Sequence, residues 1–493
     1  MRKIENKCML ITYADSMGGD LKALEHVLDT YFKAEIAGVH ILPFFPSSGD
    51  RGFAVINYDI VDPAFGTWED IDRLAEKYTL AADFMLNHIS IRAEEFQDYM
   101  EKGDASAYRD MFIHWDEFWP ESRPNEEDLR VMYSRKPGGP CREFTLNDGS
   151  KVKLWCTFYE EQVDIDPYSE ATQEYYRRNL GRLASHVPMI RFDAFAYTSK
   201  VPGTSCFFIE PQIWDILDIS MEPLKETGTA MLAEIHEEYN IQKKLEAKGH
   251  YVYDFALPLL LLHAIEFKRT DRLYHWLTIC PHHQITTLDT HDGIGVVDAA
   301  GLMTEEEMDE ISQLILARYR EDFSKQPEEL QKLDPLTAQI INVDGKQKIY
   351  QLPGTFFSDM NEDEDAYLLA RAVQLFTPGI PQIYYVGLLA GTNDFEGLIY
   401  GEGGRDVNRH NFTEEEIAER VKTPLLQKLM ALMRLRNTSS AFDGTFSVSY
   451  GQTPMELVLR WENGDVFAEL TADFDTKKFA VCVSEEAAGI IDF

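Results

Sequence analysis

Eight short apolar runs, rich in residues that favour β-strands, recur along the chain and constrain its fold more than any other feature. They are MLITYA from Met9, GVHILPFF from Gly38, LAADFMLNH from Leu80, MIRFDAFAY from Met189, TAMLAEIH from Thr229, YVYDFALP from Tyr251, ITTLDTHD from Ile285 and IPQIYYVG from Ile380. Stretches with helical periodicity, such as LKALEHVLDTYFKAEI, lie between many of them. Strands that alternate with helices form parallel sheets, and strands buried on both faces are apolar throughout. The pattern therefore predicts an α/β fold, a (β/α)8 barrel.

Two segments between these runs are too long to be simple connections. Because both follow predicted strands, we expect them to be insertions over the C-terminal face of the barrel, where barrel active sites lie. The alternative is that they are insertions without any role in a site. The predicted units are the barrel (1–88, 168–292 and 358–436), a first insertion (89–167) and a second insertion (293–357) that contains a phosphate or acceptor loop.

The ends of two predicted elements carry local signals. Thr304 and Glu307 match a capping box, which predicts the start of a helix in the second insertion. Residues 437–493 alternate apolar and polar side chains with period two, and Asn463-Gly464 is typical of a hairpin turn. This part of the sequence predicts a small antiparallel β domain.

The chain is strongly acidic. Its 493 residues include 84 Asp and Glu against 47 Lys and Arg, which gives a net charge of −37. Such a charge disfavours binding to nucleic acids or anionic membranes, and an anionic substrate would need a local basic patch. The six cysteines form no CxxC pair, the N-terminal stretch lacks a signal-peptide pattern, and no apolar run is long enough for a bilayer. We therefore expect a cytoplasmic enzyme with small-molecule substrates.

Three acidic residues, Asp193, Glu234 and Asp292, lie at or near the ends of predicted strands. The carboxyl ends of parallel strands meet at one rim, so these side chains should lie together. Retaining glycosyl transfer needs one carboxylate as nucleophile and one carboxylic acid, about 5 Å apart. Arg191 shares a strand face with Asp193 and is expected to orient it and hold it as an anion. An ion pair with a purely structural role at the barrel rim is compatible with this expectation.

At these residues the chain resembles a known family. IRFDAFAY, AEIHEEY, LDTHD and DFMLNH look like the four signature regions of glycoside hydrolase family 13, the α-amylase family. More narrowly, the chain resembles the sucrose phosphorylase subfamily in ITYADSMGG, GVHILPFFPSS, GTSCFF, VYDFALP, LDTHDGIGV, ARAVQLFTPGIPQIYYVGLLAGTNDFE and GRDVNRH. The resemblance implies a hexosyltransferase of carbohydrate metabolism that transfers a glucosyl unit to phosphate through a glucosyl-enzyme intermediate.

The resemblance also implies roles for individual residues. Asp193 is the expected nucleophile, Glu234 the general acid/base, and Asp292 the residue that stabilises the transition state. Asp50 and Arg405 are expected to close the far end of a glucose pocket as an ion pair. The other substrate-binding residues that it implies are Phe53, His88, Phe158, Arg191, Tyr197, His236, His291 and Gln351.

Basic residues of the two insertions are the expected phosphate and acceptor site. They are Arg135 and Lys136 in the first insertion, and Lys346 and Lys348 beside Tyr350 in the second. The resemblance places Lys136 and Tyr350 at positions that contact phosphate. It places Arg135 at a position where an Arg of some relatives faces the phosphate group of the sugar. Solvated surface charge is the alternative for such loop residues.

The acceptor stays open, because the signals conflict. Subfamily members often have an acid where this chain has Lys348, and the branch acting on sucrose 6′-phosphate tends to have His where this chain has Tyr350. Sucrose, sucrose 6′-phosphate and the glucosides of glycerol or glycerate are all consistent with the resemblance.

Three other functions compete with a phosphorylase. An α-glucosidase or transglucosidase is disfavoured by the basic loop residues, and an inactive scaffold by the presence of all three acids. A metal-dependent hydrolase would need clustered ligands, whereas His282 and His283 are adjacent in sequence. The amylase family often carries structural calcium near Asn87, but the subfamily resemblance implies no metal and no cofactor. Relatives are often homodimers, and the sequence itself does not decide the oligomeric state.

Overall fold

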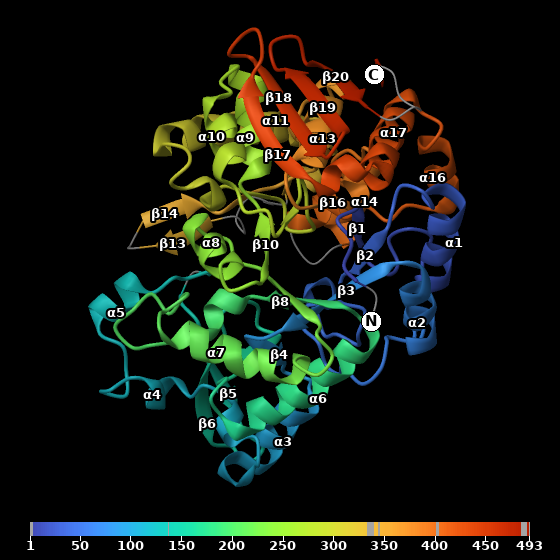
Figure 1. Cartoon of the computed structure of the whole chain (residues 1–493). Helices are drawn as coiled ribbons and strands as arrows, with labels where there is room; N and C mark the ends of the chain where they lie inside the picture. The colour runs from blue at the N-terminus through green and yellow to red at the C-terminus, as the bar shows by residue number, and fades with distance from the viewer. Residues whose placement is uncertain are drawn as a thin grey trace.

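Eight parallel strands close into a barrel in the computed structural model, which describes residues 3–136, 138–332, 340–343, 346–400, 404–484 and 491–492. The strands follow one another in the order β1, β16, β11, β10, β9, β8, β3 and β2 (Figure 1). Their bounds are β1 Met9–Thr12, β2 Gly38–Ile41, β3 Thr79–Met85, β8 Met189–Asp193, β9 Ala230–Ala233, β10 Tyr251–Asp254, β11 Gln284–Thr286 and β16 Ile380–Tyr384. Each predicted run overlaps one of these strands, so the predicted barrel is confirmed.

Helices between the strands cover the outside of the barrel. They are α1 Leu21–Tyr31, α2 Trp68–Lys77, α6 Glu170–His186, α7 Gln212–Met221, α8 Asn240–Glu246, α9 Leu257–Phe267, α10 Asp271–Ile279, α13 Glu364–Phe376, α16 Glu414–Arg420 and α17 Pro424–Thr438. Side chains cap the first turns of some of these helices: Asp20 accepts a hydrogen bond from the Ala23 N–H at 2.7 Å ahead of α1. Such caps satisfy N–H groups that have no partner within the helix.

Two long connections rise from the barrel strands. The first, between β3 and α6, contains β4 His88–Ser90, α3 Glu94–Lys102, α4 Trp115–Phe118, α5 Glu126–Val131, β5 Cys141–Thr145, β6 Lys151–Trp155 and β7 Gln162–Asp164. The second, between β11 and α13, contains β12 Ile294–Gly295, α11 Glu305–Ser324, β13 Ile340–Val343, β14 Lys346–Ile349, β15 Gln351–Leu352 and α12 Phe356–Asp359. Thr304 begins α11 with the predicted capping box, since its side chain accepts from the Glu307 N–H at 3.2 Å.

An antiparallel sheet follows the barrel, as the period-two pattern predicts. It contains β17 Thr445–Tyr450, β18 Glu456–Asn463, β19 Val466–Asp473, β20 Lys478–Val483 and the short β21 Ile491–Asp492. The hairpin at Asn463-Gly464 joins β18 to β19, and Gly464 adopts the positive φ of 62° that this turn requires. The sheet packs against α13, next to the barrel (Figure 1).

The inner faces of the barrel strands form layers. In register, Met189 of β8 pairs with Ala81 of β3, and two residues further along Arg191 pairs with Asp83. Because side chains alternate along a strand, the apolar residues form one layer and the charged residues the next. His40 of β2 extends the charged layer, with its Nε2 2.7 Å from Asp83. The charged layer therefore lies directly below the rim that carries Asp193.

A buried lysine joins the first insertion to the barrel. The Lys200 ammonium donates to the Asn87 Oδ1 at 2.7 Å and to the Tyr197 carbonyl at 2.6 Å, and lies 2.9 Å from the Asp164 carboxylate. The side chains of Lys200 and Asp164 are 4% and 0% exposed. Since Asp164 ends β7 of the insertion and Lys200 follows β8, this ion pair fixes one against the other.

The same contacts bear on the calcium position near Asn87. Calcium is bound by carboxylate, amide and carbonyl oxygens, and oxygens of these three kinds surround Lys200 here. The ammonium supplies the positive charge that such a cluster needs, and a second cation would be repelled by it. These residues therefore do not fit a bound calcium ion.

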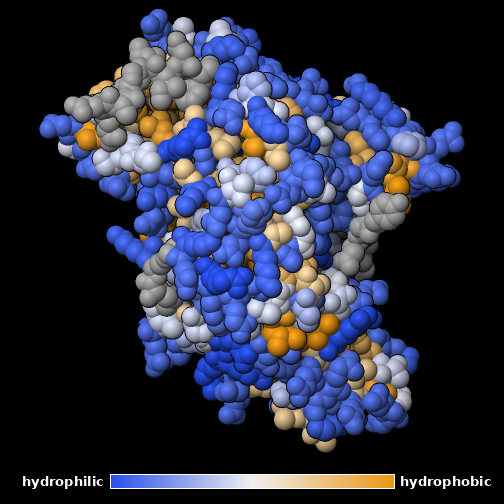
Figure 2. Space-filling view, turned by 90° about the vertical axis from the view of Figure 1, so that its right-hand side faces the viewer, coloured by the Kyte–Doolittle hydropathy of each residue, from blue (hydrophilic) through white to orange (hydrophobic). Residues whose placement is uncertain are grey.

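The surface agrees with the acidic composition. The face shown in Figure 2 is mostly hydrophilic and carries only small, separate hydrophobic areas. Within the described ranges, the structure contains no helix with the length and apolar character that crossing a bilayer requires.

Lys200→Met is expected to destabilise the fold by about 3–5 kcal/mol, because it leaves the Asp164 carboxylate buried without a cation. Thermal unfolding followed by circular dichroism measures the loss of stability. The measurement is repeated with a metal chelator, which should not change the melting temperature. Lys225→Met is the control, since Lys225 is an exposed lysine paired with Glu222 and should leave the melting temperature almost unchanged. Equal melting temperatures of the two variants would contradict the role given to Lys200.

Candidate active site

A cavity of about 550 Å³ opens at the carboxyl ends of the barrel strands, between the two insertions. Among the predicted site residues whose side chains the structure describes, the wall includes all except Arg191 and Lys348. The wall residues are Asp50, Phe53, His88, Arg135, Lys136, Phe158, Asp193, Tyr197, Glu234, His236, His291, Asp292, Tyr350, Gln351 and Arg405. Residues far apart in the sequence are thus brought together, as expected for strand ends that share one rim.

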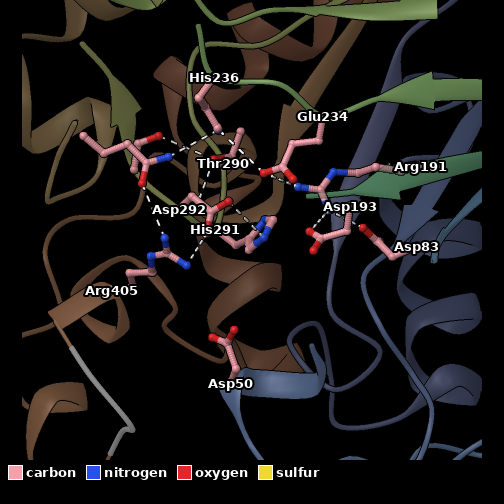
Figure 3. A network of polar contacts seen from close by, with 12 residues as sticks. Asp50, Asp83, Arg191, Asp193, Glu234, His236, Thr290, His291, Asp292 and Arg405 are labelled. Atoms are coloured by element: carbon pink, nitrogen blue, oxygen red, sulfur yellow. Dashed lines mark hydrogen bonds and ion pairs between the residues drawn. The ribbon is translucent and has the colours of Figure 1, made fainter. Parts of the chain in front are cut away.

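Arg191 connects the carboxylates of this rim from below (Figure 3). Its Nη1 lies 2.9 Å from Asp193 and also contacts Asp83, and its Nη2 lies 3.0 Å from Glu234. Just after Asp193 the chain turns through Ala194, whose φ is 53°, and the Ala194 N–H donates to the second Glu234 oxygen at 2.8 Å. Both oxygens of Glu234 are therefore held, with one facing the guanidinium.

One guanidinium does not neutralise three buried acids. Burial and the neighbouring Glu234 carboxylate raise the pKa of Asp193 well above the usual range, although Arg191 opposes this. Arg191 pairs with Asp193, as expected, but burial and Glu234 oppose the negative charge that Arg191 is expected to hold there. Two carboxyl groups this close favour a state with one proton between them. Retaining glycosyl transfer uses this combination of one carboxylate and one carboxylic acid.

Asp292 lies in the loop after β11 in a different environment. Arg405 Nη1 is 2.8 Å from it, Arg409 Nη2 is 4.0 Å away, and His291 Nε2 is 3.4 Å away. Burial disfavours its charge, but Arg405 and the other nearby cations lower the pKa of Asp292 below the usual range. Asp292 is therefore the ionised acid of the group.

Asp50 and Arg405 do not form the expected ion pair. Arg405 binds Asp292 instead, whereas Asp50 accepts one hydrogen bond, from Gln162 Nε2 at 3.2 Å. Figure 3 shows Asp50 pointing into the same space from the opposite side. Burial raises the pKa of Asp50, and Arg405 and Arg409 lower it by a smaller amount. The resulting pKa is about 6. Arg405 therefore pairs with Asp292 and not with Asp50.

Histidines and aromatic rings form the walls of the cavity. Phe53 stacks on His291 with ring centroids 4.9 Å apart, and Phe158 lies edge-on to His88 at 5.3 Å. Burial lowers the pKa of His88 to about 4 and that of His291 to about 3, so both rings are neutral at pH 7. Neutral imidazoles and apolar ring faces suit contacts with a sugar ring and its hydroxyl groups.

His236 stands beside Glu234 on the other side. Its Nδ1 is 3.0 Å from Asp298, and its Nε2 is 3.7 Å from Glu234 and 3.3 Å from Gln351. Burial opposes a charge on the ring, but Asp298 and Glu234 raise the pKa of His236. Asp298 and Glu234 therefore favour a positive charge on this ring, next to Glu234.

Arg135 and Lys136 reach the open end of the cavity. The Arg135 guanidinium lies 3.8 Å from the centroid of the Tyr350 ring. Its Nη1 is buried without a hydrogen-bond partner, and none of the described carboxylates pairs with it. Lys136 Nζ donates to the Phe158 carbonyl at 2.7 Å, and burial lowers its pKa. A guanidinium that faces a cavity without an acid beside it is suited to bind an anion.

Lys348 is not part of this cavity, contrary to the expectation. Its side chain is 48% exposed and lies 3.4 Å from Glu305, on a separate cavity beside α11. Lys348 and Ile349 line that second cavity, whereas Tyr350 and Gln351 line the first, so the chain crosses between the two cavities at this point. The side chain of Lys346 lies outside the described part of the structure.

Several wall residues were not predicted from the sequence. The first insertion contributes Arg142, Tyr159, Glu160 and Gln162, and Phe207 follows β8. Arg409, which is not a wall residue but lies 4.0 Å from Asp292, belongs to the GRDVNRH motif from which Arg405 was predicted. The insertion residues carry no comparable signal, because a loop position reveals which way it faces only after folding.

Ligand atoms of Glu234, His236 and Asp292 lie within 4.8 Å of one another, close enough for a metal ion. However, Arg191 is 3.0 Å from Glu234, Arg405 is 2.8 Å from Asp292, and Asp298 favours a protonated His236. Cations already occupy the space around these acids, so the group does not fit a metal ion.

Comparisons with known proteins agree with this geometry. A family model described as the catalytic domain of α-amylase matches residues 7–211. The sucrose phosphorylase of Streptococcus mutans serotype c is 46% identical over 470 residues, which cover 94% of each chain. The glucosylglycerol phosphorylase of Marinobacter adhaerens is 38% identical over 488 residues, 99% of this chain and 98% of that protein.

The solved structures agree as well. The crystal structure of the sucrose 6F-phosphate phosphorylase from Thermoanaerobacter thermosaccharolyticum superposes with a TM-score of 0.92 at 39% identity, covering 100% of this chain and 99% of that one. With relatives this similar over nearly the whole length, the chain belongs to the α-amylase family, glycoside hydrolase family 13, in its sucrose phosphorylase subfamily.

Proposed function

We propose that the protein is a retaining phosphorylase, a hexosyltransferase that moves a glucosyl unit from sucrose or sucrose 6′-phosphate to inorganic phosphate. The products are α-glucose 1-phosphate and either fructose or fructose 6-phosphate. The observation that carries the proposal is one cavity whose wall contains Asp193, Glu234 and Asp292 together with Arg135, which has no acid partner among the described residues.

In the first step Asp193 attacks the anomeric carbon. The bond from this carbon to the glycosidic oxygen breaks, and Glu234 gives its proton to the departing ketose. Asp193 must be the ionised member of the pair for this step, and Arg191 contacts both members, so it can stabilise either distribution of the proton. The glucosyl-enzyme forms with inversion at the anomeric carbon.

In the second step an oxygen of phosphate attacks the same carbon, and the bond to Asp193 breaks. A second inversion restores the α-configuration. Phosphate is already acidic, so this step needs little help from a general base. Arg135 and Lys136 would hold the anion at the open end of the cavity, where no acid competes for the guanidinium.

The closed end of the cavity binds the glucosyl ring in this proposal. Asp292, ionised by Arg405, would bind its hydroxyl groups and stabilise the positive charge that develops in the transition state. His88, His291 and Phe53 would contact the rest of the ring. An end closed by Asp50 admits one glucosyl unit and excludes a longer chain.

The acceptor is the finer part of the proposal. Arg142 adds a third basic side chain to the cavity wall besides Arg135 and Lys136, and it pairs with Glu160 at 4.0 Å. Three basic residues in one wall favour an acceptor that is itself anionic, such as fructose 6-phosphate. A glucoside of glycerol is the second candidate, supported by the similarity to the Marinobacter adhaerens glucosylglycerol phosphorylase. The six unpaired cysteines support a reducing, cytoplasmic location.

The purified protein should release glucose 1-phosphate from sucrose or sucrose 6′-phosphate when phosphate is present, and glucosylglycerol and glucosylglycerate test the other acceptors in parallel. Asp193→Ala should lower the rate by a factor on the order of 10⁴–10⁶, because it removes the nucleophile. Glu234→Gln should be rescued in part by glucosyl fluoride, whose leaving group needs no proton. Release of free glucose alone, at the same rate with and without phosphate, would point to a hydrolase.

Arg135→Ala should weaken phosphate binding by about 1.5–3 kcal/mol, or roughly 10- to 100-fold in kcat/KM for phosphate, because a charged hydrogen-bond donor is lost. Steady-state kinetics at varied phosphate concentration measures this change in kcat/KM. Lys348→Ala removes a cation that faces the second cavity and should have little effect. A larger loss in the Lys348 variant would reassign the anion site.

The pH profile should reflect the raised pKa of Asp193. With glucosyl fluoride as donor, kcat/KM should fall as the pH drops through this raised value, because protonated Asp193 cannot attack. The acid limb should therefore lie above about 4, the ordinary value for a carboxyl group. An acid limb at or below that value would show that Asp193 is ionised more easily than its surroundings indicate.

A further inference from the structure

The turn that carries Asp50 has an unusual backbone. Asp50 and Arg51 both adopt left-handed conformations, with φ of 54° and 51°, and Gly52 follows with φ of 109°. Residues other than glycine adopt this region at a cost, so two in succession need support from their surroundings. A Cβ at position 52 would lie 2.7 Å from the Pro43 carbonyl oxygen, so the turn also packs tightly against the end of the preceding segment.

The two left-handed residues point in opposite directions. Asp50 lines the 550 Å³ cavity that contains the catalytic acids. Arg51 lines a neighbouring cavity on the other side of the turn, together with Tyr13 and Asn411. The orientation of Asp50 toward the glucosyl site is therefore coupled, through one backbone segment, to the place where Arg51 is held.

Arg51 is held by a specific clamp. Its Nη1 and Nη2 each lie 2.9 Å from one oxygen of Asp15, and Nη2 also donates to Asn411 at 3.0 Å. The guanidinium lies 4.6 Å from the centroid of the Tyr13 ring. Asp15 follows β1, and Asn411 lies shortly before α16, in the long segment after β16, so the clamp ties the turn to two segments distant in sequence. A bidentate Arg–carboxylate pair defines orientation as well as distance.

Asp50 has little support of its own. The one hydrogen bond to its carboxylate among the described residues comes from Gln162 at 3.2 Å, and Arg405 binds Asp292 instead. The side chain of Asp50 therefore depends on its backbone for direction, and the backbone depends on the clamp.

We infer that Arg51 and Asp15 are positioning residues that hold Asp50 in place to bind the glucosyl ring. This inference rests on the proposed glucosyl transfer, but it concerns residues that do not touch the substrate. It predicts that loss of the clamp affects the glucosyl end of the cavity and spares the phosphate end.

A double-mutant cycle tests the inference, with Arg51→Ala, Asp50→Ala and the combined variant. The measured quantities are kcat/KM for glucosyl fluoride and KM for phosphate. Arg51→Ala alone should lower kcat/KM about tenfold, within the range for coupled neighbouring residues. The same substitution should have almost no effect when Asp50 is already alanine. KM for phosphate should not change in Arg51→Ala.

Additive losses in the cycle, or an equal rise in KM for phosphate, would overturn the inference and leave Arg51 with a role in stability alone. Asp15→Asn keeps the shape of the clamp but weakens its charge, so it should lower kcat/KM for glucosyl fluoride by less than Arg51→Ala does. Arg51→Lys should recover part of the activity but not all of it, because lysine cannot form the bidentate pair. Arg177→Ala, at an exposed arginine paired with Glu174, is the control. Absence of glucosyl transfer by the unmodified protein would instead reject the proposed function.

Discussion

The Arg191 guanidinium is the interaction on which the site depends. It lies inside the barrel, 3% exposed, and contacts carboxylates from three neighbouring strands or their ends, Asp83, Asp193 and Glu234. Burying one of these acids without a cation would be costly. Burial and the neighbouring Glu234 carboxylate raise the pKa of Asp193, although Arg191 opposes this. The barrel thus places two carboxyl groups around one guanidinium.

The cavity is lined both by acids that cations bind and by basic residues without such an acid. Arg405 binds Asp292, and Arg191 binds Asp193 and Glu234, whereas Arg135 and Lys136 pair with none of the described carboxylates. This arrangement solves the problem that the composition poses, since a protein with a net charge of −37 repels anions at long range. Short-range guanidinium contacts inside a partly buried cavity are screened less than surface charges and can outweigh that repulsion.

The expectations that depended on local sequence were confirmed. The eight strands, the Thr304 cap and the Asn463-Gly464 hairpin all follow from side-chain periodicity or turn chemistry, which act over a few residues. The expectations about which side chains lie together were wrong in two places. Arg405 was expected to bind Asp50 but binds Asp292, and Lys348 was expected in the cavity but faces a different one. Both errors concern residues outside the barrel strands: Lys348 lies in β14 of the second insertion and Arg405 in the segment after β16. Which side each of them faces depends on how these segments pack on the barrel.

The sequence by itself determined the barrel, the strand ends that carry Asp193 and Glu234, and the shared face of Arg191 and Asp193, because strand alternation and parallel pairing leave few other arrangements. Only the tertiary structure decided which acid each cation binds, how Lys200 ties the first insertion to the barrel, and how Arg51 holds the turn at Asp50. These contacts join residues distant along the chain. Their outcome depends on differences of about an ångström between competing partners, and such differences exist only after the chain has packed.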